Sequence, residues 1–262
     1  MMARPAKRPT TKIGALVAAL AVCAALVGGA TPVCAQEPGR PIPHASLLLA
    51  TSPEQPIPSS ATLHLMRAIE DAWRDVRTVH ATFDQTRLDE VFEEEIVSPG
   101  EMWFDRPDRF RCDYAEPRAL ITLILPEILF IYVPEIEQVD YWRFENADER
   151  DRQMHHLLIG FGFDTEELIE QYIVTRPEDD APRLRVEPRP WIAETCPFTE
   201  MELIVNEDTL RPERIRYMDP SGNEFTLTMK TVETDMPLDD ALFDKEAVFP
   251  KNVDYVDKRE ML

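Results

Sequence analysis

The sequence predicts a mainly β protein of the α+β class, in which helices cover one curved antiparallel sheet. Beyond residue 78, most of the chain consists of short runs of alternating apolar and polar residues, as in half-buried strands. Other segments have apolar residues at helical spacing. The strands offer more apolar surface than a thin sheet can hide. We therefore expect the helices to lie on the sheet, over either a ligand cavity or a fully packed core.

The first 35 residues have the pattern of a secretory signal peptide. An apolar run over residues 13–30 precedes Val33-Cys34-Ala35, which offers small residues for cleavage. The basic side chains that open the segment are Arg4, Lys7, Arg8 and Lys12. An uncleaved membrane anchor is the alternative, because the apolar run is nearly long enough to span a bilayer. Residues 36–58 are rich in proline and predict a tether. Residues 59–262 then form a single domain.

The domain begins with a helix and a strand. Residues 61–76 predict an amphipathic helix. Its apolar face holds Leu65, Ile69, Trp73 and Val76. Residues 79–87 alternate between apolar and polar side chains, which predicts a half-buried strand with Phe83 on its apolar side.

Residues 97–117 predict two short strands that meet at a bend. The strands cover residues 102–105 and 110–114, and Arg106-Pro107-Asp108 separates them. Proline has no N–H group and does not sit inside a central strand, so this corner marks a bend or an edge. Counting in twos from Phe110 gives one apolar face and one charged face, as in a sheet curled around an apolar interior.

Residues 119–133 are the most apolar part of the chain after the signal segment. Pro126-Glu127 splits them, so they are too short and too broken to span a membrane and fit two strands around a tight turn. Both faces of these strands are apolar and need cover. One face would line a cavity, and the other would pack under a helix or meet a partner. A further strand runs through Phe144.

Two short helices and a second series of strands follow. Asn146 and Asp164 each supply a helix-start signal, and the glycines at 160 and 162 end the first helix. His155 and His156 point about 100° apart on that helix and cannot chelate one ion together. We expect at least one of them to be exposed. The later strands are expected over 172–175, 183–187, 198–205, 214–217 and 224–229, with a type I turn at 219–222.

Charge and cysteine content exclude several functions. The chain holds 28 basic and 49 acidic side chains, a net charge of −21, and loss of the signal segment makes it more negative. Such a surface repels phosphate backbones and excludes nucleic-acid binding. Cys112 and Cys196 remain after cleavage, and they form either a disulfide or two buried free thiols. The chain has no C-x-x-C motif for a redox or zinc site.

No pattern of catalytic residues is present. The chain lacks a G-x-S-x-G nucleophile motif and an H-E-x-x-H metal helix, and too few glycines remain in the domain for a phosphate-binding loop. We assign no catalytic residue, no metal and no cofactor.

The pattern G-x-x-W-x-x-R-P-x-x-F-R-x-D-Y over Gly100–Tyr114 closely resembles the core of the LolA family, the periplasmic carriers of outer-membrane lipoproteins. An amphipathic helix followed by V-x-A-x-F-x-Q at 79–85 is also how members of that family begin. Residues 132–139 continue the family's Y-x-P and Q-V pattern. Pro126-Glu127 stands where the family usually has an Asp-Gly turn. The resemblance covers about Leu65 to Val256.

This resemblance implies an incomplete antiparallel β-barrel with a helical lid that holds acyl chains in an apolar cavity. We expect the cavity to be lined by Phe83, Met102, Phe104, Phe110, Leu123, Phe130 and Tyr132. The lid residues are Leu65, Ile69, Leu157, Leu158 and Phe161. Arg106 matches the family's arginine that keeps the empty lid closed. A guanidinium beside an apolar cavity needs acceptors, and helix-end carbonyls of the lid could provide them. The alternative is that Arg106 only ties down the corner.

Two functions fit these features. The first is a monomeric periplasmic carrier that moves lipoproteins from inner to outer membrane. Its implied partners are acylated lipoproteins, an inner-membrane ABC-type release complex and an outer-membrane acceptor. The second is a regulatory module on the same fold, which senses lipid or mislocalised lipoprotein and binds a membrane signalling protein. The proline-rich tether and the unusual hairpin at 119–133 would suit this second function.

Overall fold

The computed structural model describes residues 57–89, 94–177 and 181–258. The expected signal peptide 1–35 lies outside the described residues, as does the expected tether apart from its last two positions. Within the described ranges, no helix is long and apolar enough to cross a membrane.

Strands are the most frequent regular element of the described chain. They are β1 Thr78–Asp89, β2 Glu94–Asp105, β3 Arg109–Tyr114, β4 Leu120–Leu125, β5 Ile128–Val133, β6 Gln138–Arg143, β7 Tyr172–Thr175, β8 Arg183–Pro188, β9 Glu200–Val205, β10 Pro212–Met218, β11 Glu224–Thr234 and β12 Asp254–Asp257. The helices are α2 Ser60–Trp73, α3 Ala147–Leu158, α4 Thr165–Gln171 and α5 Lys245–Val248, and the short 3₁₀ turns are η3 Pro134–Ile136, η4 Ile159–Phe161 and η5 Asp240–Phe243.

The helix starts follow capping chemistry. Ser59 caps α2 by accepting a hydrogen bond from the backbone N of Thr62 at 3.1 Å. Asn146 and Asp164 accept from backbone N atoms three residues later, at 2.9 and 2.8 Å. Each cap satisfies a backbone donor that the first turn leaves without a partner. The helix starts expected at 146 and 164 are therefore confirmed.

The strands of the sequence prediction are present, with three main differences. β2 begins at Glu94 rather than at residue 102, because it pairs with β1 along its whole length. β11 continues to Thr234 because it pairs with β1 as far as Val79. β12 was not expected, because its four residues have no clear apolar alternation and it is defined by its parallel pairing with β6. The turn at 219–222 is confirmed by the bond from Gly222 N to Asp219 O, 3.0 Å long.

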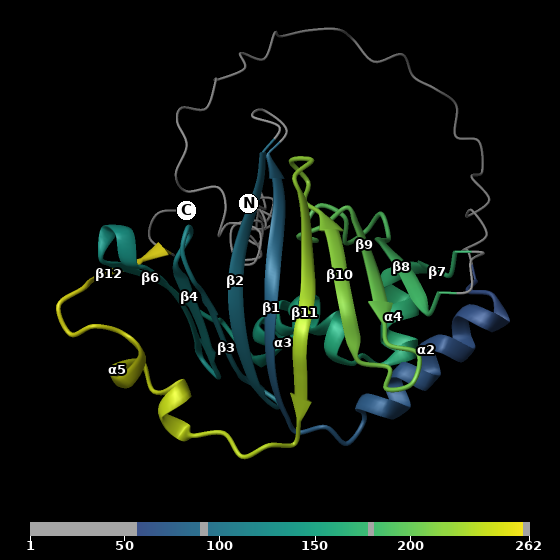
Figure 1. The fold of residues 1–262 in the computed structure, drawn as a ribbon, viewed down its shortest axis with the longest axis horizontal. Coiled ribbons are helices and arrows are strands. Elements are labelled where there is room, and N and C mark those ends of the chain that lie inside the picture. Colours follow the sequence, from purple (N-terminus) through teal and green to yellow (C-terminus); the bar gives the residue numbers. More distant parts are fainter. Residues whose placement is uncertain (1–56, 90–93, 178–180, 259–262) are drawn as a thin grey trace, which may run out of the picture.

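All twelve strands form one sheet in the order β12-β6-β5-β4-β3-β2-β1-β11-β10-β9-β8-β7. Every pairing is antiparallel except β12 with β6. The edge strands β12 and β7 are not paired with each other, so the sheet curls without closing. Helices α2, α3 and α4 lie on its concave side, and the segment between β11 and β12 runs past β3–β6 (Figure 1). The expected incomplete antiparallel barrel with helices is confirmed.

Candidate functional site

The concave face of the sheet and the helices over it share one apolar cluster. Four residues expected to line the cavity, Phe83, Met102, Phe104 and Phe110, belong to this cluster, and each is at most 4% exposed. The lid residues Leu65, Ile69, Leu158 and Phe161 belong to the same cluster. The side chain of Leu157 lies outside the described residues. The structure therefore brings four of the seven expected cavity residues together with four of the expected lid residues in one apolar layer.

The expectation that Leu123, Phe130 and Tyr132 line the same cavity is wrong. Their side chains lie in a second cluster, under Phe243 and Phe249 of the C-terminal segment. Strand parity gives the reason. Phe110 pairs with Ile124, so the neighbouring residue Leu123 points to the opposite face of the sheet. Sequence hydrophobicity could not assign a face because both faces of this hairpin are apolar.

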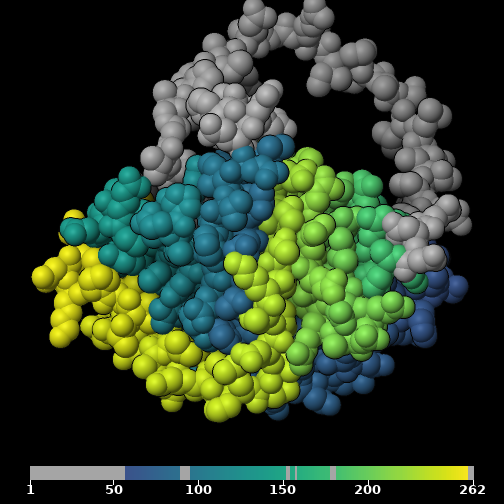
Figure 2. Space-filling model, viewed as in Figure 1, coloured from purple at the N-terminus to yellow at the C-terminus, as the bar shows by residue number. Residues whose placement is uncertain are grey.

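The space-filling view shows the cover of this second cluster. The C-terminal segment, in yellow, lies against the strands in teal (Figure 2). Phe249 packs on Phe130 and Tyr132, with ring centroids 5.6 and 5.9 Å away. The second face of the 119–133 hairpin is therefore covered by the protein's own chain.

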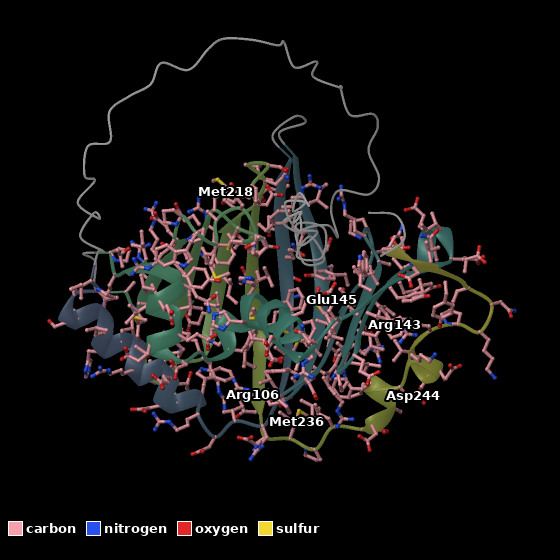
Figure 3. All side chains as sticks on the ribbon, turned by 180° about the vertical axis from the view of Figure 1, so that it is seen from behind. Arg106, Arg143, Glu145, Met218, Met236 and Asp244 are labelled. Atoms are coloured by element: carbon pink, nitrogen blue, oxygen red, sulfur yellow. The ribbon has the colours of Figure 1, made fainter. Side chains whose placement is uncertain are left out.

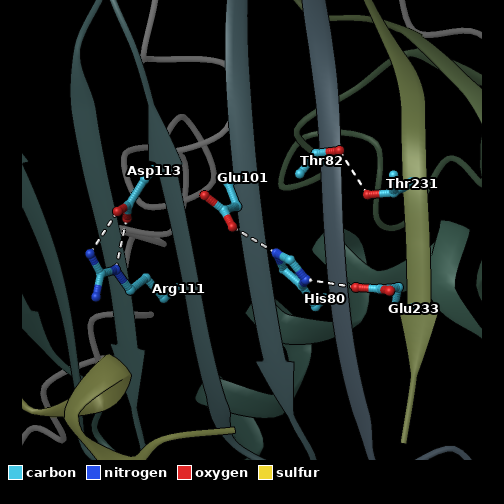
Figure 4. Close-up of polar contacts among 7 residues, drawn as sticks. All are labelled: His80, Thr82, Glu101, Arg111, Asp113, Thr231 and Glu233. Carbon is cyan, nitrogen blue, oxygen red and sulfur yellow. Dashed lines mark hydrogen bonds and ion pairs between the residues drawn. The ribbon is translucent and has the colours of Figure 1, made fainter. Parts of the chain in front are cut away.

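The middle of the outer face is polar. His80 on β1 lies between two carboxylates, with Nε2 2.7 Å from Glu101 Oε1 and Nδ1 3.2 Å from Glu233 Oε2 (Figure 4). Thr82 and Thr231 join their hydroxyls at 2.7 Å across the same strands. These side chains link β2, β1 and β11 on the side away from the helices, so the apolar site lies on the concave side.

A cavity of about 730 Å³ opens between the helices and the corner that joins β2 to β3. Its apolar lining includes Trp73, Phe104, Met154, Leu158 and Phe163. Its rim is charged, with carboxylates from α2, α3 and α4 and three arginines. An amphiphile with an apolar chain and a polar head suits such an opening, because the chain can enter the apolar layer while the head stays at the rim.

Arg106 of the corner contacts the ends of two helices. Its Nη2 donates to the backbone carbonyl of Phe161 at 2.6 Å, and its Nη1 lies 3.5 Å from the carbonyl of Trp73. The guanidinium lies over the ring of Phe104, 5.6 Å from its centroid. Figure 3, from the helical side, labels Arg106 near this end of the sheet. These carbonyls come from the ends of η4 and α2, as expected for helix-end acceptors.

The electrostatic environment of Arg106 is that of a partly desolvated cation. Burial lowers the pKa of Arg106 from its ordinary value, while Asp235 acts in the opposite direction. Arginine keeps its charge at any physiological pH. The bond to Phe161 therefore persists across the pH range in which histidines and carboxylates titrate.

Sequence reasoning missed two features of the residues that surround the Arg106 guanidinium. Gly162 was assigned only to the end of a helix. It has a φ of 106°, and a Cβ there would lie 2.7 Å from Trp73 Cβ and 2.9 Å from Arg106 Nη2. A side chain at this position would displace the guanidinium. Trp73 was assigned only to the apolar face of its helix, but its Nε1 also donates to Leu210 O at 3.1 Å. No sequence signal identifies a backbone carbonyl as an acceptor.

The two cysteines are buried and are not joined in a disulfide, so of the two alternatives the structure has the thiols. Burial raises the pKa of the Cys196 thiol to about 12. Among the residues that the structure describes, no three His, Cys, Asp or Glu side chains are grouped so as to hold a metal ion.

Comparison with known proteins gives concordant matches. A family model described as outer membrane lipoprotein carrier protein LolA matches residues 74–246. An outer-membrane lipoprotein carrier protein of Alkalilimnicola ehrlichii is 31% identical over 186 residues, which are 70% of this chain and 79% of that protein. A protein of the same name from Halorhodospira halophila is 34% identical over 122 residues, covering 44% and 56% of the two chains. The crystal structure of an uncharacterized conserved protein from Thermus thermophilus aligns with a TM-score of 0.45 at 16% identity, over 75% of this chain and 99% of that one.

Proposed function

The chain belongs to the LolA family of outer-membrane lipoprotein carrier proteins, and from this premise we propose that it carries acylated lipoproteins across the periplasm. The acyl chains lie between the concave face of the sheet and the helical lid. The carrier is loaded by an ABC-type release complex of the inner membrane and gives its cargo to an outer-membrane acceptor. The signal segment at residues 1–35 directs the chain to that compartment.

The observation that carries the proposal is the position of the hydrogen bond from Arg106 to Phe161, which we call the latch, at the edge of the apolar layer. Arg106 bonds the carbonyl of Phe161 at 2.6 Å, directly beside the cavity of about 730 Å³. An acyl chain that enters the layer must separate the helices from the sheet and lengthen this bond. Ligand occupancy and lid position are then coupled, because the ligand binds the open lid better than the closed one.

Noncovalent burial is sufficient to hold such a ligand. Each methylene group transferred from water to an apolar site contributes about 0.8 kcal/mol. A chain of a dozen methylenes therefore offers on the order of 10 kcal/mol before the cost of opening the lid. The lid contacts reduce this affinity, which allows cargo to pass to an acceptor with a stronger hold.

Native mass spectrometry of the mature chain purified from a periplasm tests the proposal. We expect co-purified lipoprotein or diacyl lipid with the wild type, and its loss in Phe110→Glu, which places a charge in the concave cluster. Phe130→Glu is the matched control, since that residue is equally buried but lies in the outer cluster. A wild-type protein that carries no lipid and takes up no added acylated peptide overturns the proposal.

A transfer assay separates the carrier from the sensing module. A carrier delivers bound cargo to acceptor membranes or to an acceptor protein and is recovered empty. A sensing module retains the lipid and forms a stable complex with a protein partner only when lipid is bound. Retention of this kind would contradict the carrier function and leave the lipid cavity in place.

A further inference from the structure

The last turn of α3 meets the edge strand β7 through aromatic rings. His155 stacks on Tyr172, with ring centroids 6.2 Å apart and planes 15° from parallel. His156 places its Nδ1 2.7 Å from the Tyr172 hydroxyl. Tyr172 is 1% exposed and stacks on Phe198, which lies just before β9. Both histidines are only partly exposed, so the expectation that at least one faces solvent is wrong.

The position of His155 suits a neutral ring. Its Nε2 is buried and has no hydrogen-bond partner among the described residues. Its Nδ1 is 3.8 Å from Glu167 Oε1, beyond hydrogen-bond distance. Burial lowers the pKa of His155, and the charges of Glu167 and Asp164 oppose this effect without overcoming it. A proton on this ring would leave a cation with one buried N–H donor and no acceptor for it.

The other titratable and charged groups around His155 do not provide that acceptor. They come from α4, α2, α3, the β2–β3 corner and the region of β7. They are Glu167, Asp164, Glu70, Arg74, Asp148, Arg150, Asp151, His156, Arg106, Tyr172 and Cys196. Tyr172 and Cys196 stay neutral, because burial raises the pKa of both groups. Glu167 is 52% exposed, so water screens its attraction for the imidazolium.

The lid thus has two polar attachments of different chemistry. Arg106 ties η4 and α2 to the β2–β3 corner and stays charged. His155 and His156 tie the end of α3 to Tyr172 at the start of β7. We propose that the second attachment is a pH-sensitive fastening: protonation of His155 releases α3 from β7 and opens the lipid cavity. This inference rests on the proposed function only in naming lipid as what the open cavity takes up or releases.

The direction of the pH effect follows from linkage. Burial holds the pKa of His155 below its ordinary value in this structure, and exposure of the ring to water would return the pKa towards that value. Its contribution to the closed state is therefore fully present above the ordinary histidine pKa of about 6.5 and is lost as the pH falls below it. Acid opens the lid, and neutral pH closes it.

Hydrogen exchange of the α3 amides tests the fastening without any lipid. Wild type and His155→Gln are compared with each other at the same pH, at about pH 8 and about pH 5, on either side of the ordinary histidine pKa. Glutamine carries no charge at either pH. On acidification, we expect the protection of the α3 amides to fall at least about threefold more in the wild type than in His155→Gln. His64→Gln, an exposed histidine on α2, is the matched control and should behave as the wild type.

The outcomes distinguish this inference from the proposed function. Parallel loss of α3 protection in wild type and His155→Gln overturns the fastening. Release of a bound acylated peptide is measured at the same two pH values. If the peptide binds, and its release rate is the same for wild type and His155→Gln at each of the two pH values, the fastening fails while the carrier function stands. If α3 opens as expected but no acylated peptide ever binds, the fastening stands and the carrier function fails.

Discussion

Each face of the sheet carries an apolar layer, the concave one extensive and the outer one confined to the strands near β4–β6, and the two layers have different covers. The outer layer is covered by the C-terminal segment, which Arg109 and Arg111 hold. Arg109 Nη1 is 2.8 Å from Asp240 Oδ1 and its guanidinium lies 4.9 Å from the ring centroid of Phe243. Arg111 Nη1 donates to Leu242 O at 3.2 Å. The concave layer is covered by helices that Arg106 holds beside a cavity.

This difference indicates which of the two covers a ligand can displace. Each cover is bonded to an arginine, Arg106 in the β2–β3 corner and Arg109 at the start of β3, and each guanidinium lies over an aromatic ring. The outer cover inserts Phe249 between Phe130 and Tyr132, so it packs into the layer that it protects. The concave cover meets its layer beside an opening of about 730 Å³. A ligand can therefore replace cover contacts on the concave side.

The largest expected effect compares one phenylalanine from each layer. Phe110→Ala and Phe130→Ala remove rings that are 2% and 4% exposed. Each should lower the free energy of unfolding by about 3–5 kcal/mol, because a buried ring is lost and a cavity remains. Only Phe110→Ala should also weaken the uptake of an acylated peptide. Chemical denaturation and a fluorescent lipid-uptake assay measure the two quantities on the same samples.

The comparison fails if lipid uptake falls equally in both variants. In that case the outer layer would also contact the ligand, or uptake would follow overall stability. Measuring uptake per folded molecule, well below the denaturation midpoint of each variant, separates these two causes.

The next effect concerns the latch itself. Arg106→Leu removes the charged donor to Phe161 O, and a hydrogen bond to a charged group contributes about 1.5–3 kcal/mol. The closed lid should lose this amount relative to the open one, so lipid should bind about 10- to 100-fold more tightly and transfer more slowly. Titration with an acylated peptide and a transfer assay check both. Arg109→Leu, which removes a contact of β3 with the outer cover, should leave lipid affinity unchanged. Equal effects of the two variants would contradict separate roles.

Most of the fold could be predicted from the sequence because its signals are local. Helix caps at Ser59, Asn146 and Asp164 act within three residues, and strand alternation has a period of two. The turn at Asp219 follows from four consecutive residues. β12 could not be predicted from local signals, because it is defined by its pairing with β6, which lies more than a hundred residues earlier in the chain.

The site could be predicted only in part, for a related reason. Phe110 lies in the concave layer, and Arg106 bonds a helix-end carbonyl of the type expected, while their roles in lipid binding stay predictions. Leu123 and Phe130 were assigned to the wrong layer, because a strand that is apolar on both faces has no sequence signal for which face is inside. The environment of His155 depends on Tyr172 and Glu167, which only the docking of α3 brings near.

A smaller effect tests how the concave cover meets β7. Tyr172→Phe keeps the ring stack with His155 but removes the hydroxyl that lies 2.7 Å from His156 Nδ1. The free energy of unfolding should fall by about 0.5–1.5 kcal/mol, the usual contribution of one hydrogen bond. The pH dependence of α3 opening should remain, because His155 is still present. Urea denaturation measures the stability, and abolished pH dependence would assign the fastening to His156 and Tyr172.

The smallest effect belongs to the polar middle of the outer face, which neither cover reaches. Glu101→Gln removes a charge that lies 2.7 Å from His80 Nε2, but the Glu101 side chain is 45% exposed. Exposed pairs of this kind contribute about 0.2–1 kcal/mol, and added salt reduces the contribution further. We therefore expect a small, salt-dependent loss in denaturation midpoint and unchanged lipid uptake. A loss as large as that of Phe130→Ala would mean that the strands β2, β1 and β11 are held together by this polar contact more than by the apolar layer on their concave side.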